Sequence, residues 1–467
     1  MINSVFYTLE VVQHELLLFC AVWLLIGAID DLCIDLIWIA RWIYRRMTFY
    51  RSRPPLRAGE LKPPERPGLL AIFIPTWREA NVIGAMLSQC LQKWNGGETR
   101  FQIYVGCYPN DNEGIREVLR TAAAAKGQIR LVLLAHCGPT TKADCLNRLW
   151  RALLSDELAG GYKSKAVILH DAEDSVHSRE LEIFDRMIEK AAAVQLPVIP
   201  IPIVRSRWIS AHYCDEFAEA HGKSMVVREA IGAALPLAGV GCAIERNLLG
   251  RFALARNGSP FDDSSMTEDY ELGLKIGAVG GRTIMARIRD DDGQWVATSA
   301  CFPDTLDASV RQKARWLTGI ALAGWDRLGW RGSFAEKWMR LHDRRSIFSA
   351  FVLMVAYICV VLTTILALLN AGRQFKPEPL PDILTPLLAL NAFFLLWRVL
   401  VRAAFVSALY GYAEGIRSVP RNLIANIIAI MAARRACIAY LRHCFGEPLK
   451  WDKTTHHFVR QIGPKDD

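Results

Sequence analysis

The stretch Ala166-Val167-Ile168-Leu169-His170-Asp171-Ala172-Glu173-Asp174 places an acidic turn directly after four apolar residues. A short apolar run bounded by polar residues is typical of a buried strand. Carboxylates at the end of such a strand can direct their oxygen atoms into one cleft, and these ligands suit a hard cation that bridges phosphate oxygens. Capping of the next helix by Asp171 or Asp174 explains the turn, taken alone, equally well.

Three other apolar runs precede this one, and a helical pattern follows each of the four. The expected strands lie at 69–74, 101–106, 129–135 and 166–170, and the expected helices at about 79–94, 113–125, 142–154 and 179–193. This alternation predicts an α/β fold with a mostly parallel, Rossmann-like sheet that binds ligands at the carboxyl ends of its strands. The absence of G-x-G-x-x-G and G-x-x-x-x-G-K-[ST] argues against a dinucleotide dehydrogenase and a P-loop hydrolase.

Polar residues also follow the other strands, at the same edge of the expected sheet. Pro75, Thr76 and Glu79 come after the first strand, Asp111 after the second, and Lys142 closes the turn after the third. A lysine in this position can reach a phosphate as a mobile point charge, although a solvated helix start is its commoner fate.

The segment Thr267-Glu268-Asp269-Tyr270-Glu271 forms a second acidic cluster. A positioned carboxylate such as Asp269 can remove a proton from a hydroxyl nucleophile, which is the work of a general base. The alternative is an ordinary helix start, with Thr267 as the cap and the acids in the first turn.

A third group of residues, Gln312, Arg315 and Trp316, would share one face of a helix. That face would offer a guanidinium group to a diphosphate and an aromatic ring to a sugar. An amphipathic helix beside a membrane is the alternative and, without context, the favoured one. The turn Gly239-Val240-Gly241 could bring backbone close to a bound molecule or be only a tight turn.

Three segments are apolar enough to cross a membrane. No charge interrupts 347–369, and about 1.5 Å per residue makes it long enough for a hydrocarbon core of roughly 30 Å. The segment 383–410 carries Arg398 and Arg402 on one face, and these either extend to the interface or face a polar passage. The segment 6–29 lacks a signal-peptide cleavage site and is expected to remain as an anchor.

Basic residues indicate how these segments are oriented. They crowd the end of the first segment and the start of the second, at Arg41, Arg45, Arg46, Arg51, Arg53, Lys337, Arg340, Arg344 and Arg345. The positive-inside rule therefore places the polar region between them in the cytosol. The loop at 371–381 would lie outside, and the apolar run within 421–440, too short to span, would form an interfacial helix on the cytosolic side.

Composition excludes two further classes of protein. Much of the net charge of +9 lies beside membrane segments, and no zinc finger or RNA-binding signature accompanies it, so we expect no nucleic-acid partner. The twelve cysteines form no C-x-x-C pair, which argues against a disulfide framework or structural zinc.

These patterns divide the chain into five parts. They are an N-terminal membrane helix with an amphipathic extension at 1–49, a proline-rich linker at 50–68, a cytosolic domain at 69–340, two membrane helices at 341–410, and an interfacial helix with a tail at 411–467.

The motifs P-T-x-x-E, K-A-D-x-L-N, D-A-E-D, T-E-D and Q-x-x-R-W, in this order, resemble the membrane-bound family 2 glycosyltransferases, relatives of cellulose and hyaluronan synthases. The resemblance covers residues 69–317 and the flanking membrane segments. The runs at 169–174, 267–272 and 451–456 look most like the phage adsorption protein B subfamily, inner-membrane enzymes of surface-polysaccharide assembly.

The resemblance implies a GT-A fold for the cytosolic domain and a role for each matching residue. Pro75, Thr76, Glu79, Asp111 and Lys142 would hold a nucleotide-sugar, most simply a UDP-sugar. The diphosphate and a Mg²⁺ or Mn²⁺ ion would lie at Asp171 and at Glu173 or Asp174, since Glu173 replaces the second Asp of the family's D-x-D motif. Asp269 would be the base, beside Glu268 and Thr267. Gln312, Arg315 and Trp316 would close over the diphosphate, and the acceptor would lie against Trp316, Gly239, Val240 and Gly241.

The function expected from the resemblance is inverting transfer of a sugar to a growing surface or secreted polysaccharide, at the bacterial inner membrane. Expected partners are the UDP-sugar, a glycan or lipid-linked acceptor, membrane lipid and an outer-membrane or periplasmic export protein. Two alternatives stay open: transfer of one sugar to a lipid carrier, and a catalytically silent scaffold that docks an envelope complex or a phage. We expect no regulation by a cyclic dinucleotide within these residues, since the chain stops at Asp467, where close relatives continue into a sensing domain.

Overall fold

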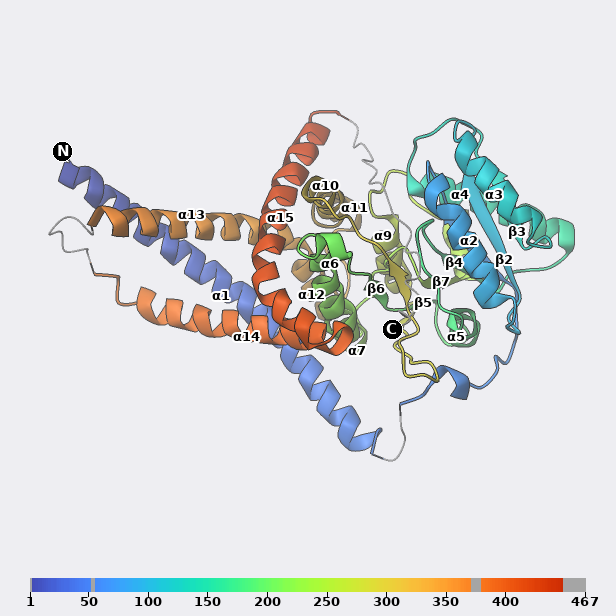
Figure 1. Ribbon diagram of the computed structural model, residues 1–467, viewed down its shortest axis with the longest axis horizontal. Helices are drawn as coiled ribbons and strands as arrows, with labels where there is room; N and C mark the ends of the chain where they lie inside the picture. The colour runs from blue at the N-terminus through green and yellow to red at the C-terminus, as the bar shows by residue number, and fades with distance from the viewer. Residues whose placement is uncertain (1, 52–54, 371–378, 448–467) are drawn as a thin grey trace.

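The structure is a computed structural model, and it describes residues 2–51, 55–370 and 379–447. The motif at 451–456 and most of the loop at 371–381 lie outside the described residues. Figure 1 shows a sheet domain at one end and long helices at the other, with α15 (Tyr412–Cys444) between them.

A seven-stranded sheet of order β3-β2-β1-β4-β7-β5-β8 forms the centre of the domain. Its strands are β1 (Leu70–Pro75), β2 (Phe101–Cys107), β3 (Ile129–Leu133), β4 (Ala166–Leu169), β5 (Ala193–Gln195), β7 (Cys242–Glu245) and β8 (Thr283–Met285). All neighbouring strands are parallel except that β7 runs antiparallel between β4 and β5. The four strands predicted from the sequence are present, and the mostly parallel sheet is confirmed.

Helices cover both faces of this sheet. One apolar core joins the first face to α2 (Ala80–Trp94), α3 (Asn112–Ala123) and α5 (Glu180–Met187). A second core joins the other face to α4 (Lys142–Gly160), α8 (Arg246–Leu254) and α9 (Glu268–Ala278). Because strands buried on both faces must be apolar throughout, the runs in the sequence are continuous rather than alternating.

Two expectations about local structure need correction. The predicted helix at 179–193 ends at Met187, because the backbone from Ala193 to Gln195 pairs with β7 and β8. The linker at 50–68 is partly packed, since Ala58 is buried in the first core and its backbone N–H donates to Arg289 O at 2.8 Å.

The remaining elements connect the sheet to the long helices. They include a short sheet of β6 (Val198–Pro200) and β9 (Thr298–Ala300). They also include the helices α6 (Ala211–Glu219), α7 (Met225–Ala230), α10 (Leu306–Leu317), α11 (Ala323–Leu328) and α12 (Phe334–Arg344). Two π-helical turns link pairs of these helices. Ala220–Ser224 lies between α6 and α7, and Thr318–Leu322 lies between α10 and α11.

Four helices among the described residues are long and apolar enough to cross a membrane. They are α1 (Ile2–Thr48), α13 (Ser346–Asn370), α14 (Leu384–Tyr410) and α15. The first three agree with the predicted segments. α15 is one continuous helix of 33 residues, longer than the apolar run seen in the sequence. In Figure 1 it lies across the ends of α13 and α14, as an interfacial helix would, and the number of crossings stays a prediction.

Arg398 and Arg402 do not extend freely toward an interface. Arg398 forms an ion pair with Asp31 of α1, and Arg402 bonds to Glu219 of α6 at 3.0 Å. Both arginines line a small polar cavity of about 140 Å³. They therefore attach α14 to α1 and to the sheet domain.

Arg421 attaches α15 to the domain in a similar way. It is 1% exposed and donates to both oxygens of the buried Asp215 at 2.6 and 2.7 Å, and to Glu414 at 2.8 Å. A buried charge pair is costly to break, because the remaining partner is left in a medium of low polarity.

Arg421→Met should therefore destabilise the protein by about 3–5 kcal/mol, seen as a lower melting temperature in detergent. Arg417→Met is the matched control. Arg417 pairs with Glu414 at the surface, where an ion pair contributes about 0–1 kcal/mol. Adding Asp215→Leu should restore most of the loss. Equal melting temperatures for the two single variants would contradict this role of Arg421.

Candidate active site

The site lies where the chain order of the sheet reverses. β2 and β3 lie on one side of β1, and β4 lies on the other. In open α/β sheets the carboxyl ends of the strands beside such a point border a ligand-binding crevice. Leu169 at the end of β4 pairs with Cys242 at the start of the antiparallel β7, so the turn before β7 reaches the same edge.

One cavity of about 170 Å³ opens at this edge and gathers most of the predicted residues. These residues come from six separate parts of the chain. They are Pro75, Thr76, Glu79, Lys142, Asp171, Glu173, Asp174, Val240, Thr267, Glu268, Asp269, Gln312, Arg315 and Trp316. Asp111, Gly239 and Gly241 do not line it.

Lys142 joins three parts of the cavity. It begins α4, after a cap in which Thr141 accepts from the Asp144 N–H. Its Nζ lies 2.5 Å from Asp171 Oδ1 and donates to the Gly239 carbonyl at 3.2 Å. Burial opposes its charge, but Asp171 and the carboxylates of α9 outweigh it and raise the pKa of Lys142 above its ordinary value. Lys142 therefore stays charged and balances the acidic cavity.

His170 holds the acidic turn in place from its buried side. The ring is fully buried, with Nδ1 2.9 Å from Asp174 and Nε2 3.0 Å from Glu180. Burial opposes the imidazolium, but the two carboxylates outweigh this and raise the pKa of His170 to about 10. Asp174 also accepts from the Asp171 N–H at 3.0 Å and is only 1% exposed. Asp174 is thus occupied mainly in holding the turn, which favours Glu173 as the second outward carboxylate.

The second acidic cluster stands at the N-terminus of α9, where the helix dipole favours negative charge. Thr267 precedes the helix but makes no capping bond, so the capping alternative fails for its side chain. Burial, together with Asp269, raises the pKa of Glu268 to about 7. Burial also raises the pKa of Asp269, although Lys142 opposes this. A carboxylate with a raised pKa is a stronger base.

The turn before β7 approaches Asp269 closely. Gly239 has φ +75°, and a Cβ placed there would lie 2.2 Å from Asp269 Oδ2. The buried side chain of Gln195, at the end of β5, holds this turn by donating to the Val240 carbonyl and accepting from the Ala238 N–H, both at 2.9 Å. The role of Gln195 was not predicted from the sequence, where its only signal is an amide side chain directly after the apolar pair Ala193-Val194.

α10 supplies the opposite wall. Gln312, Arg315 and Trp316, the three residues expected to share one helix face, all line the cavity. Burial lowers the pKa of Arg315, whereas the facing carboxylates favour its charge. Behind this face Ala314 packs against Ala432 and Ala436 of α15. The helix that closes the cavity therefore rests directly on α15.

Three buried polar atoms that belong to cavity-lining residues have no hydrogen-bond partner among the described residues. They are Asp174 Oδ1, Thr267 Oγ1 and Gln312 Oε1. Buried polar groups are almost always bonded, so unsatisfied atoms gathered around one cavity point to a polar ligand. The donor set of carboxylate oxygens at Asp171 and Glu173 also fits Mg²⁺ or Mn²⁺.

Asp111, which was also predicted, supports the site from outside the cavity. Asp111 caps α3 and accepts from the Arg78 N–H at 2.7 Å, which fixes the turn after β1.

Trp77 and Tyr108, which follow β1 and β2, line the cavity with rings 5.2 Å apart. Sequence analysis did not assign these aromatics, although their positions at strand ends are the same signal that identified Thr76.

The described residues contain one group of three metal-type ligands that already lie close together, and it is elsewhere. Asp30, Asp31 and His342 meet at the boundary of α1 and α12. The two carboxylates already have partners, because Asp30 contacts His342 and Arg345, and Asp31 pairs with Arg345 and Arg398. We interpret this group as an ion-paired joint between helices.

The fold and the cavity together define the class of protein: a GT-A-like α/β domain with an acidic crevice, joined to long apolar helices. A family model described as "Glycosyltransferase like family 2" matches residues 67–319. The chain therefore belongs to glycosyltransferase family 2.

Comparisons with known proteins also give relatives of the chain and a structure with the same fold. The chain is 34% identical over 482 residues to bacteriophage adsorption protein B of Escherichia coli (strain K12) and, equally, to bacteriophage N4 adsorption protein B of Escherichia coli O157:H7. Each alignment covers 98% of this chain and 63% of the relative's length. A mannosyltransferase from Pyrobaculum calidifontis, solved with GDP-Man and Mn²⁺, shares the fold, with a TM-score of 0.51 and 16% identity over 88% of this chain and 99% of that one.

Gly239→Ala should displace Asp269 and lower the transfer rate by about 100-fold or more, because small misplacements of reacting groups have effects of this size. Gly232→Ala is the matched control, since Gly232 has nearly the same φ, +74°, with no atom within 4 Å of an added Cβ. Backbone strain is then common to both variants, and contact with Asp269 is particular to one. Transfer is measured in detergent with labelled nucleotide-sugar. Equal transfer rates for the two variants would show that crowding Asp269 has no effect and would contradict the prediction.

Proposed function

We propose that the chain is a metal-dependent inverting transferase that moves a sugar from a UDP-sugar to a growing surface or secreted polysaccharide. The observation that supports it most is the set of unsatisfied buried atoms of Asp174, Thr267 and Gln312 around the acidic cavity. A polar molecule in the cavity would offer partners to these groups.

The donor would bind along the carboxyl edge of the sheet. The nucleoside would lie near Thr76 and Glu79, with Trp77 and Tyr108 as its aromatic surroundings. Arg315 and Gln312 would face its diphosphate, and guanidinium groups bind phosphates with geometric specificity. The leaving diphosphate gains negative charge during transfer, so cations fixed in advance stabilise the transition state.

Asp171 and Glu173 would hold the divalent cation, with phosphate oxygens and water as further ligands. The ion supplies Lewis-acid stabilisation of the leaving diphosphate. Lys142 already forms an ion pair with Asp171, which helps to fix the direction of this carboxylate in the cavity.

Asp269 would accept the proton of the acceptor hydroxyl as that oxygen attacks the anomeric carbon. Its position at the start of α9, the close turn at Gly239 and its raised pKa all suit a general base. Direct displacement of this kind inverts the anomeric configuration.

The acceptor would approach from the α10 side of the cavity. Trp316 packs near Tyr213, Phe217 and Phe302, with ring centroids 6.0–6.4 Å apart, and this aromatic group suits a sugar ring. With the basic flanks of α1 and α13 on the cytosolic side of the inner membrane, the cavity would face the compartment that holds activated sugars. An outer-membrane or periplasmic export protein would receive the product.

Asp269→Asn should abolish transfer while retaining donor binding, because the amide cannot take up the proton at neutral pH. The loss should be about 10²–10⁴-fold, the usual contribution of a general base. The measurement is transfer of labelled sugar in detergent, with UDP binding followed in parallel. Asp263→Asn, outside the cavity, is the control. Near-normal transfer by Asp269→Asn would remove Asp269 from this role, and silence of the wild-type chain with every nucleotide-sugar would favour the scaffold.

The two candidates for the second metal ligand should behave differently. Glu173→Gln should raise the Mn²⁺ concentration for half-maximal activity at least about tenfold and leave the melting temperature unchanged. Asp174→Asn should mainly lower the melting temperature, since it removes the charge opposite His170, a loss of about 1–3 kcal/mol. The reverse pattern would assign the metal to Asp174.

A further inference from the structure

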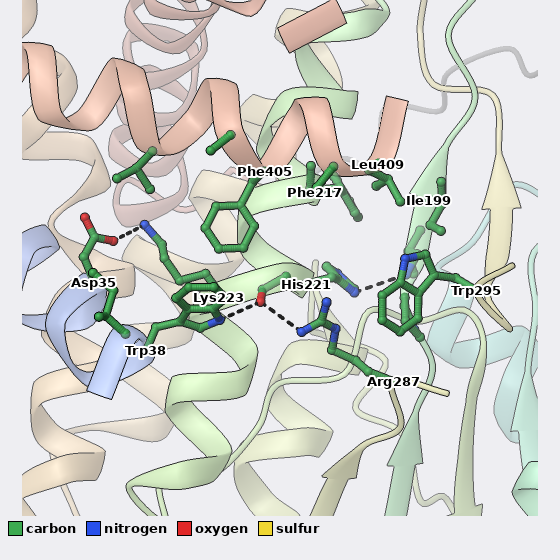
Figure 2. A pocket seen from close by; sticks show the side chains of 18 of the residues that line it. Asp35, Trp38, Ile199, Phe217, His221, Lys223, Arg287, Trp295, Phe405 and Leu409 are labelled. Carbon is green, nitrogen blue, oxygen red and sulfur yellow. Dashed lines mark hydrogen bonds and ion pairs between the residues drawn. The ribbon is translucent and has the colours of Figure 1, made fainter. Parts of the chain in front are cut away.

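A second cavity of about 350 Å³ lies between the sheet domain and the long helices (Figure 2). Its walls come from α1, the π-helical turn Ala220–Ser224, the residues around Trp295, and the last turns of α14. Figure 2 shows Phe405 and Leu409 of α14 directed into it from one side and Trp295 and Arg287 at the far end.

This cavity adjoins the catalytic cavity. Val198 and Phe217 line both, so the two cavities share these side chains as part of their walls. A molecule in the second cavity therefore lies next to the cavity that contains Trp316 and Asp269.

Most polar groups in the second cavity are already bonded to each other. Lys223 pairs with Asp35 and with Glu219. The indole N–H of Trp397 donates to Asp35 at 2.9 Å, and that of Trp38 to the Gly222 carbonyl at 3.1 Å. The cavity thus offers few free groups to the many hydroxyls of a glycan.

Arg287 and Arg289 are the exception. Both guanidinium groups stack on Trp295, at 4.8 and 4.3 Å from its ring centroid. Each donates to a backbone carbonyl, that of Gly222 or Gly293, and neither forms an ion pair with a carboxylate of the described residues. Two cations held on one ring without a counter-charge are complementary to an anion such as a phosphate.

The α14 side of the cavity is apolar. It is formed by Val401, Ala404, Phe405, Ala408 and Leu409. These residues belong to the last turns of a helix that is apolar enough to cross a membrane. An alkyl tail that leaves the cavity along α14 would therefore enter lipid directly.

We propose that this cavity binds a lipid phosphate, with the phosphate at Arg287 and Arg289 and the apolar tail along α14. The lipid is the carrier of the acceptor, so its sugar end lies in the catalytic cavity. The role of the lipid as acceptor carrier rests on the proposed function. Binding of the lipid phosphate is measured without any transfer reaction.

The test uses the full chain in phosphatidylcholine nanodiscs with radiolabelled farnesyl phosphate as the probe. Farnesol, which has the same tail without the phosphate, and inorganic phosphate, which has no tail, are the competitors. Arg287→Gln combined with Arg289→Gln is the test variant. Arg116→Gln combined with Arg251→Gln, two exposed arginines that do not line the cavity, is the matched control.

Farnesyl phosphate should bind the wild-type and control proteins equally, and the test variant at least about tenfold more weakly, as expected for lost bonds to a charged group. Neither farnesol nor inorganic phosphate should compete at concentrations that saturate farnesyl phosphate. Unchanged binding in the test variant would overturn the proposal. Full competition by inorganic phosphate would identify a free-anion site, and full competition by farnesol a tail-only site, and either result would also overturn it.

UDP binding to the wild-type protein separates this inference from the proposed function. If UDP and Mn²⁺ bind but farnesyl phosphate does not, the lipid site is wrong and the transferase stands. If farnesyl phosphate binds as described but UDP does not, the proposed function is wrong and the lipid site stands.

Discussion

The site depends on the ion pair between Lys142 and Asp171. Several carboxylates share one cleft, and their negative charge must be balanced by cations. Asp171, Glu173, Glu268 and Asp269 all face the same cavity, and their mutual repulsion would be severe in a partly buried space. Lys142 from α4 and Arg315 from α10 supply the positive charge, and each is fixed by the helix that carries it. The cleft is thus held open and charged before any ligand enters, which is the condition for electrostatic catalysis.

The second constraint is mechanical, because one wall of the cavity depends on helices beyond the sheet domain. α10 packs against α15 through small residues, and α15 is attached to α6 by the buried pair of Arg421 and Asp215. Arg398 and Arg402 join α14 to α1 and α6. Residues of α1, α6 and α14 also line the second cavity beside the active site. The long helices therefore contribute to the second cavity and, through α15, support the α10 wall of the first.

The sequence predicted the parts of the molecule in which local pattern and tertiary position agree. The strands before Thr76 and Asp171 are continuous apolar runs, and the placement of acids at their ends follows from the topology of parallel sheets. Gln195 could not be predicted in this way, because its role depends on a strand only three residues long that pairs across the chain with β7. The pairing of Arg398 with Asp31 was equally hidden, since the two residues are far apart in sequence and neither pattern implies the other. The contact between Asp174 and His170 could not be predicted either, because it depends on the fold of the turn after β4.

The central proposal is that a nucleoside diphosphate binds in the charged cavity at the carboxyl ends of β1 and β4. An electron cryo-microscopy structure of the chain in nanodiscs with saturating UDP and Mn²⁺ tests it most directly. We expect density for the uracil and ribose near Thr76 and Tyr108, and for the diphosphate between Asp171 and Arg315. A cavity that remains empty under these conditions, or nucleotide bound at another place, would contradict it.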